Sequence, residues 1–400
     1  LWSATATSFG ELLVARLFLG AITAAAGPVT ASLTGDWFAG SERGRIYGYI
    51  LTGELLGAGA GFAFTGDIAA LSWRAAFVIL ALPAFLLAWM VIRLPEPVRG
   101  GQGALLPDPA TVRAQASRTA RPKAPAPEAV EPQVLAAEKG IQPDPALVRR
   151  AARRMSFMDA VRYIMSVRTN VALIISGACG YYFMTGVQTF GSEFVGGQYH
   201  VGQAIANLLL LVIGVGAVGG VLVAGPISDA LLRRGYLTAR VTVPAVAATM
   251  TVVLFIPALI THSAFTALPY VVFAAAALTA QNPPVDAARL DIMPSWLWGR
   301  AEGLRTLLRT AAQALAPVLF GAVSDYAFGG GTGGLKWTFV VMLAPLAACA
   351  VFLYGARRLY PVDVATAAAA SVVHPPPPPR GSKAQRRAPG WQHSGSAETA

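Results

Sequence analysis

The feature that most constrains this chain is a series of nine long apolar segments. A helix that crosses a bilayer needs about 20 mostly apolar residues, and each segment offers roughly that length. Only 13% of the 400 residues are charged, whereas soluble domains carry about 25%. The sequence therefore predicts an all-α membrane protein with nine transmembrane helices. The segments run near Leu12–Gly35, Ile46–Ala69, Ala75–Arg93, Thr169–Gly191, Ala204–Pro226, Val241–Thr261, Phe265–Val285, Leu307–Asp325 and Trp337–Arg357.

Lysine and arginine are almost confined to alternate loops between these segments. If every segment spans, all but three of the 31 fall on one side, the exceptions being Arg16, Arg74 and Lys336. Cytoplasmic loops attract Lys and Arg, so we expect these loops and the C-terminus to lie in the cytoplasm of a multi-pass protein of the cell membrane. This orientation accounts for the net charge of +11, and we expect no nucleic-acid partner.

The sequence offers no constellation for catalysis or metal binding. The two cysteines, Cys179 and Cys349, lie inside apolar segments, and the four histidines are scattered over loops and tail. This spacing suits neither a disulfide framework nor a zinc site. No nucleotide-binding loop or catalytic triad can be placed. We therefore expect a protein that is not an enzyme and has no metal or cofactor.

The polar stretches predict a linker and a tail. Gly100–Pro145 is rich in Pro, Ala, Arg and Gln, which predicts a flexible chain. Ala146–Val167 predicts a basic amphipathic helix, which either lies on the inner membrane surface or covers the inner ends of the bundle. The tail contains the run Pro375–Pro379 and is expected to be disordered. The expected division is an N-terminal helical bundle over 1–96, a linker over 97–167, a six-helix bundle over 168–360 and a tail over 361–400.

Two loops are weakly similar to each other. Trp37–Arg45 and Trp296–Arg305 each follow a proline-containing helix and begin the next helix. Transporters are often built from internal repeats. If these loops are equivalent, the first apolar segment matches the fourth of the six segments that begin at Thr169. We therefore expect the chain, which begins with Leu1, to be an N-terminally truncated part of a twelve-helix protein and to hold the equivalents of helices 4–12.

The loop after the fifth segment carries the clearest motif. Residues Gly225–Gly235 resemble the inner-loop signature of the major facilitator superfamily, in which Gly, three residues and Asp are followed by basic residues. Here Ala230 replaces the usual basic residue and Leu232 the usual Gly. Arg16–Gly20 resembles the start of the family's fourth helix, and Trp73–Phe77 resembles the start of its sixth. Pro95–Gly100 resembles the sequence that follows the sixth helix in Spinster-like members.

The resemblance implies two six-helix bundles around a central cavity that opens alternately to each side. The expected protein is a monomeric secondary transporter of a small organic solute, coupled to protons, with the substrate and the lipid bilayer as its partners. Two alternatives are a Spinster-like exporter of lipid-like molecules and a non-transporting membrane receptor or scaffold.

The same resemblance implies an inner gate. The loop with Asp229 would latch the two halves, with the start of the helix near Ile46 as its partner, through Arg45. A carboxylate can accept hydrogen bonds from a helix N-terminus or pair with an arginine. The alternative is a solvated loop carboxylate beside arginines that set the orientation. The expected gate residues are Gly225, Asp229, Arg233, Arg234 and Arg45.

Glu54 is the acidic residue placed deepest in an apolar segment. It lies eight residues into its segment, about 12 Å deep at about 1.5 Å per residue. Ionisable residues at such depth are usually functional, so Glu54 is expected to couple protons or contact substrate, alone or with Arg16. The alternative is a structural carboxylate paired with Arg16 or a neighbouring helix. Candidates for lining the cavity are Tyr181, Tyr182, Gln188 and Asn282, and Asp286, Arg289 and Asp291 are expected near the inner gate.

Overall fold

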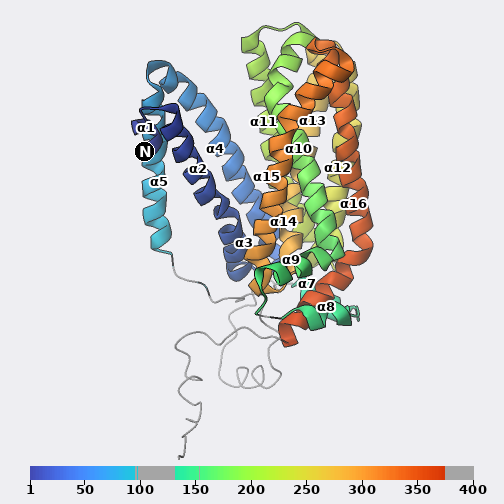
Figure 1. Cartoon of the computed structure of the whole chain (residues 1–400). Coiled ribbons are helices and arrows are strands. Elements are labelled where there is room, and N and C mark those ends of the chain that lie inside the picture. Colours follow the sequence, from blue (N-terminus) through green and yellow to red (C-terminus); the bar gives the residue numbers. More distant parts are fainter. Residues whose placement is uncertain (95–96, 98–130, 153, 374–400) are drawn as a thin grey trace, which may run out of the picture.

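The computed structural model describes residues 1–94, 97, 131–152 and 154–373, and its described backbone is almost entirely helical (Figure 1). The N-terminal part contains α1 (Trp2–Thr5), α2 (Phe9–Ala24), α3 (Ala26–Trp37), the short 3₁₀ helix η1 (Gly40–Glu42), α4 (Arg43–Leu71) and α5 (Trp73–Ile92). The hydroxyl of Ser8 caps α2 by accepting a hydrogen bond from the Glu11 amide at 3.2 Å. The break between α2 and α3 precedes Pro28, whose ring would clash with the carbonyl of Ala24 in a continuous helix.

The C-terminal part forms a bundle of long helices. It contains α10 (Arg168–Tyr199), α11 (Gln203–Arg233), α12 (Ala239–Ile260), α13 (Ala264–Ala280), α14 (Asn282–Asp291), η2 (Ser295–Leu297), α15 (Trp298–Ala322), the π-helical turn η3 (Val323–Ala327) and α16 (Gly331–Val373). The predicted segment Phe265–Val285 is divided by a break between α13 and α14. Pro283 and Pro284 have no amide N–H for a continuing helix, so a new helix starts at Asn282.

Eight helices or helix pairs of the described residues are long and apolar enough to cross a membrane. The all-α membrane class is confirmed. The predicted segment Ile46–Ala69 lies within α4, a continuous helix of 29 residues. This helix is not among the eight, because Glu54 and several glycines make it less apolar than the others. The count of nine is therefore not confirmed.

The N-terminal helices meet the C-terminal bundle at one end, the lower end in Figure 1. There α4 packs against α11 and α14, and α3 packs against α15. The arginine-bearing loops meet at this same end, where the Arg233 guanidinium donates to the Ser41 carbonyl at 3.1 Å. We call this the basic end, formed by η1, η2 and the short helices that precede α10.

Three short helices cover the basic end: α7 (Pro132–Glu138), α8 (Pro145–Arg150) and α9 (Phe157–Ser166). The prediction of a flexible chain over Gly100–Pro145 is wrong from residue 131 onward. Leu135 and Ala136 of α7 are buried in the main core, which offsets the entropy of ordering this segment. Residues 100–130 lie outside the described residues.

The amphipathic helix expected over Ala146–Val167 is divided between α8 and α9. Ala160, Tyr163 and Ile164 of α9 are buried against the bundle, as expected of a helix that covers its ends. Phe157 and Met158 are exposed on another face. The membrane-surface alternative therefore stays open for that face.

The last helix continues past the expected start of the tail at Pro361. Helix α16 ends at Val373, and residues such as Val364 and Ala370 are buried. The Asp363 carboxylate accepts from the Thr169 amide at 3.1 Å, which caps the first turn of α10. These contacts order residues 361–373, which the composition alone suggested to be disordered. The run Pro375–Pro379 lies outside the described residues.

Candidate functional site

Asp229 connects the two parts of the molecule at the basic end. It lies near the end of α11 and is 1% exposed. Its carboxylate accepts hydrogen bonds from the amides of Gly44, at 3.2 Å, and Arg45, at 2.7 Å. These amides belong to the first turn of α4, where N–H groups lack partners within the helix and the helix dipole favours an anion. A carboxylate of the C-terminal bundle thus holds the N-terminus of an N-terminal helix.

Gly225 allows this contact for a steric reason. A Cβ atom placed on Gly225 would lie 2.2 Å from the Gly44 carbonyl oxygen. A Cβ atom on Gly44 would lie 2.6 Å from a carboxylate oxygen of Asp229. Real Cβ atoms do not approach so closely, so both positions require glycine while α11 and α4 touch. Gly225 and Asp229 of the motif therefore both serve the contact between α11 and the first turn of α4.

Asp229 also pairs with a buried arginine that leads to a second carboxylate. Arg240, at the start of α12, places Nη2 3.1 Å from Asp229 and Nε 3.1 Å from Asp291 at the end of α14. Arg43, the first residue of α4, places Nη1 3.3 Å from the other oxygen of Asp291. The Tyr360 hydroxyl donates to Asp291 at 2.8 Å. The charges are balanced, because two carboxylates face two guanidinium groups.

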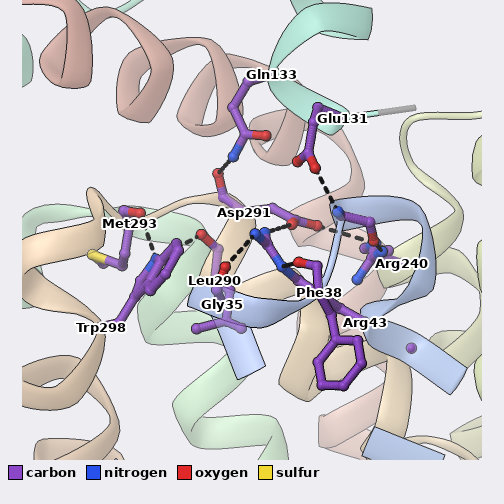
Figure 2. Close-up of polar contacts among 12 residues, drawn as sticks. Gly35, Phe38, Arg43, Glu131, Gln133, Arg240, Leu290, Asp291, Met293 and Trp298 are labelled. Atoms are coloured by element: carbon purple, nitrogen blue, oxygen red, sulfur yellow. Dashed lines mark hydrogen bonds and ion pairs between the residues drawn. The ribbon is translucent and has the colours of Figure 1, made fainter. Parts of the chain in front are cut away.

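The two arginines also bind backbone carbonyls of the N-terminal part (Figure 2). Arg43 donates to the carbonyls of Gly35 and Phe38, each at 3.2 Å. Arg240 donates to the carbonyl of Gly40 in η1. Buried ion pairs offset their desolvation only when their remaining hydrogen bonds are made. The carbonyls supply such bonds, and they bring α3, η1 and α4 into the same network.

Trp298 closes this network from the side of α15. Its indole Nε1 donates to the carbonyls of Leu290, at 3.0 Å, and Met293, at 2.9 Å (Figure 2). Its ring lies 5.3 Å from the Arg43 guanidinium, within the range of a cation–π contact. A Cβ atom on Gly35 would lie 2.1 Å from the ring, so the indole packs directly on the backbone of α3.

A second buried charge cluster lies between α14 and α15. Arg289 of α14 contacts Glu302 of α15 at 2.5 Å and also binds Asp286. Arg305 places its Nε 3.1 Å from Glu302 and its Nη1 3.8 Å from Asp286. All four side chains are at most 8% exposed. We call these four residues the α14–α15 cluster.

Glu54 faces the C-terminal bundle from α4. It is exposed, and it interacts electrostatically with Asp286 and with Arg309 of α15. The Arg309 guanidinium lies 4.5 Å from the centre of the Tyr181 ring. Glu54, Arg309 and Tyr181 therefore adjoin the α14–α15 cluster. Whether any of them contacts a substrate stays a prediction.

Arg16 lies elsewhere. Its guanidinium is 4.5 Å from the centre of the Phe77 ring of α5, and the side chain is exposed. Among the described residues no ion pair is formed between Arg16 and Glu54. The structure therefore does not bring these two candidates together.

The remaining predicted gate arginines do not bind Asp229 through their side chains. Arg45 pairs with Glu42 at 3.3 Å in an exposed position and reaches Asp229 only through its backbone amide. Arg233 binds the Ser41 carbonyl, and Arg234 is exposed. The arginine side chain on Asp229 is instead Arg240.

The cavity candidates occupy different surroundings. Tyr182 is buried in an aromatic core of the C-terminal bundle, and its hydroxyl donates to the Met342 sulfur at 3.3 Å. It therefore packs within that bundle and does not face α4. Gln188 is exposed on α10, and Asn282 is half-buried at the first residue of α14. Of the four candidates, only Tyr181 adjoins the charged residues described above.

Sequence reasoning missed several members of these networks. In the sequence, Arg43 and Arg240 stand among the basic residues that set the orientation, and Glu302 and Arg305 lie in the repeated loop Trp296–Arg305. One signal could have identified them: charged residues at or inside segments of membrane length are usually paired and functional. Within the described residues no group of three His, Cys, Asp or Glu side chains is placed to hold a metal ion.

Comparison with known proteins agrees with this architecture. The sequence model of the Major Facilitator Superfamily matches residues 1–268 of the 400. No curated protein matches the chain. Because the match covers more than half of the sequence, the chain belongs to the Major Facilitator Superfamily of membrane transporters.

Proposed function

We propose that this chain acts in proton-coupled secondary transport and moves a small organic solute by alternating access. Membership of the superfamily supports secondary transport in general. The solute, the proton coupling and the placement of the basic end in the cytoplasm belong to the proposal. A cytoplasmic basic end agrees with the preference of Lys and Arg for cytoplasmic loops.

The observation that carries the proposal is the network around Asp229 and Asp291. It joins α3, η1 and α4 to the C-terminal bundle through polar contacts at the basic end. Such a network suits a closed gate, since its contacts can be exchanged for water when the halves separate. In this proposal the structure represents the state that is closed at the basic end.

Proton coupling is proposed for Glu54 together with the α14–α15 cluster. Carboxylates inside membrane segments are costly, and they mark proton and substrate pathways. Glu54 interacts electrostatically with Asp286 across the boundary between α4 and α14. A proton or a charged substrate that changes this interaction would act on both parts of the molecule at once.

The test uses the full-length protein in vesicles that contain a pH indicator. A panel of amino acids, sugars, organic acids, organic cations and a fluorescent lysolipid is applied, and solute-dependent proton movement is measured. Glu54→Gln is expected to abolish proton movement. Glu193→Gln, an exposed acid of α10, is the matched control and is expected to leave it unchanged.

Three outcomes would decide against parts of the proposal. Solute movement without proton movement would refute the coupling. Movement of the lysolipid alone would favour an exporter of lipid-like molecules. A folded protein that moves no member of the panel would favour a receptor or scaffold.

A further inference from the structure

Residues 131–151, which contain α7 and α8, lie across the basic end, and we call them the strap. Hydrogen bonds fasten the strap to the C-terminal part at three places. The Gln133 amide donates to the Asp291 carbonyl at 3.1 Å. The Lys139 ammonium donates to the Gly235 carbonyl at 2.5 Å, and the Asp144 backbone amide donates to the Thr366 hydroxyl at 2.9 Å.

Apolar packing strengthens this attachment. The buried strap residues belong to a core cluster whose other members lie mostly in the C-terminal part, including α10, α12, α14 and α16, with Ala31 of α3 and Tyr47 of α4 as the members from the N-terminal part. Helix α16 packs against both α7 and α8. The strap is therefore expected to move with the C-terminal bundle as one body. The buried strap residues of this cluster are Leu135, Ala136, Leu147 and Ala151.

One polar contact of the strap reaches the other part of the molecule. The Gly40 amide of η1 donates to the Glu131 carboxylate at 2.8 Å (Figure 2). Pro132 packs on the same glycine, where a Cβ atom would lie 2.4 Å from the proline ring. The carbonyl of Gly40 accepts from Arg240. The peptide groups of Gly40 are thus held from two sides by residues outside the N-terminal part.

The charges around Glu131 favour this position. Arg43 and Arg240 attract its carboxylate, whereas Asp291 repels it. The nearby network contains the carboxylates of Asp229 and Asp291 and the guanidinium groups of Arg43 and Arg240. Glu131 adds a third carboxylate to it. This carboxylate comes from the strap, and nothing in the superfamily signature around Gly225–Gly235 includes it.

We propose that the strap is a clamp on the basic-end gate and that Glu131 is its releasable contact. This inference rests on the proposed function. When the gate opens, α3, η1 and α4 separate from the C-terminal bundle that carries the strap. The Glu131–Gly40 contact must then break, while the other strap contacts remain. Glu131 therefore stabilises the closed gate in addition to Asp229.

The test measures the accessibility of η1 in the full chain. Ser41 is 3% exposed and lies next to Gly40, so Ser41→Cys reports separation of η1 from the bundle. The labelling rate with a soluble maleimide is measured in lipid nanodiscs, and the signal of the chain without Ser41→Cys is subtracted. Glu131→Ala is expected to raise the rate about tenfold, the factor that corresponds to about 1.4 kcal/mol for one lost charge-assisted hydrogen bond.

The matched control is Glu138→Ala, because Glu138 is an exposed acid at the far end of α7, the helix that Glu131 precedes as its N-cap residue. It is expected to label at the rate of the unaltered chain. Glu131→Asp provides a second variant if Glu131→Ala does not fold. It keeps the charge but withdraws the carboxylate by one methylene, so it is also expected to label faster.

A parallel Asp229→Asn variant separates the clamp from the gate. If Asp229→Asn speeds labelling and neither Glu131 variant does, the clamp is refuted and the gate stands. If none of these variants changes the rate while all remain folded, the closed gate itself is refuted. If the Glu138 control is as fast as Glu131→Ala, the effect belongs to loss of charge on α7, and the clamp is refuted.

Discussion

Replacing Asp229 by alanine is expected to open the basic end. The change removes two hydrogen bonds to the first turn of α4 and the ion pair to Arg240. Removing one partner of a buried ion pair costs about 3–5 kcal/mol. Arg240 retains Asp291 and the Gly40 carbonyl, so the lower end of this range applies. The closed state should lose about 3 kcal/mol, a factor of about 150 in the equilibrium between closed and open forms.

This factor predicts a measurable change in population. If the open form begins at about 1%, a loss of about 3 kcal/mol raises it to about 60%. Spin labels at Glu42→Cys and Tyr236→Cys would report it, because these exposed side chains lie in η1 and between α11 and α12. Cys179 and Cys349 are replaced by alanine to remove background labelling. The distance distribution between the labels should gain a long component in the Asp229→Ala variant.

The control for this measurement is Asp159→Ala. Asp159 is an exposed acid of α9 whose only ion pair among the described residues, with Arg162, is 3.8 Å long. It should leave the distance distribution unchanged, because exposed pairs contribute little. An unchanged distribution in a folded Asp229→Ala variant would refute the role of Asp229 as the tie between the two parts.

Other changes give further tests. Gly225→Ala should lower the stability by about 1–3 kcal/mol through overpacking against Gly44, measured by thermal unfolding, whereas Gly219→Ala has open space and should be neutral. Tyr360→Phe should cost about 1 kcal/mol in the same assay, because its buried carboxylate partner loses one hydrogen bond. Burial raises the pKa of Glu131 above its ordinary value of 4.5, against the attraction of nearby arginines. The raised pKa means that the arginines and the Gly40 amide do not fully offset the cost of burying the ionised carboxylate. This cost is absent below the ordinary pKa and appears as the pH rises through the raised value, so the closed form is more favoured in acid. The labelling rate of Ser41→Cys is divided by that of an exposed cysteine at the same pH, because the reactive thiolate becomes scarcer in acid for every cysteine. This ratio should fall in acid, and Glu131→Gln should weaken the dependence.

The membrane class and the common location of the basic loops could be predicted from the sequence. Each follows from the preference of a residue type for its surroundings. Long apolar runs indicate segments in lipid, and arginines concentrate in the loops on one side of the membrane. The contact of the Arg233 loop with Ser41 places two such loops together, although they are 192 residues apart in sequence. The preference of each residue for lipid or for one side of the membrane adds up along the chain. It can therefore be read from the sequence without knowing which residues contact each other.

The choice of partner for Asp229 could not be predicted in the same way. The family resemblance places the start of α4 opposite Asp229, but it does not decide between the helix N-terminus and the Arg45 side chain as the donor. In the structure the backbone amides of that turn donate to the carboxylate. The Arg45 side chain is then left to pair with Glu42 in an exposed position. Arg240 became the partner through the packing of α12, which no local pattern specifies.

Two further differences have equally local causes. Neighbouring residues of a helix point about 100° apart, so Tyr181 can lie on Arg309 while Tyr182 enters the aromatic core. Choosing between them required the rotation of α10 in the bundle. The strap has no clear signal in the sequence, because its few apolar residues lie in a long stretch that is polar on average. Burial of a few residues, such as Leu135 and Ala136, is enough to order α7 because they pack into the main core cluster.

The distribution of contacts suggests how the molecule could open without losing its core. The aromatic core cluster is built wholly from residues of the C-terminal bundle, such as Phe183, Phe320 and Phe339. Many contacts between the two parts are instead ion pairs and hydrogen bonds to backbone. Buried ion pairs gain little net free energy, because their attraction is offset by desolvation. The apolar core cluster that spans both parts takes only Ala31 and Tyr47 of its buried members from the N-terminal part. Separating the parts would therefore expose few buried apolar side chains of the N-terminal part, whereas exposing the aromatic cluster would cost its full apolar burial.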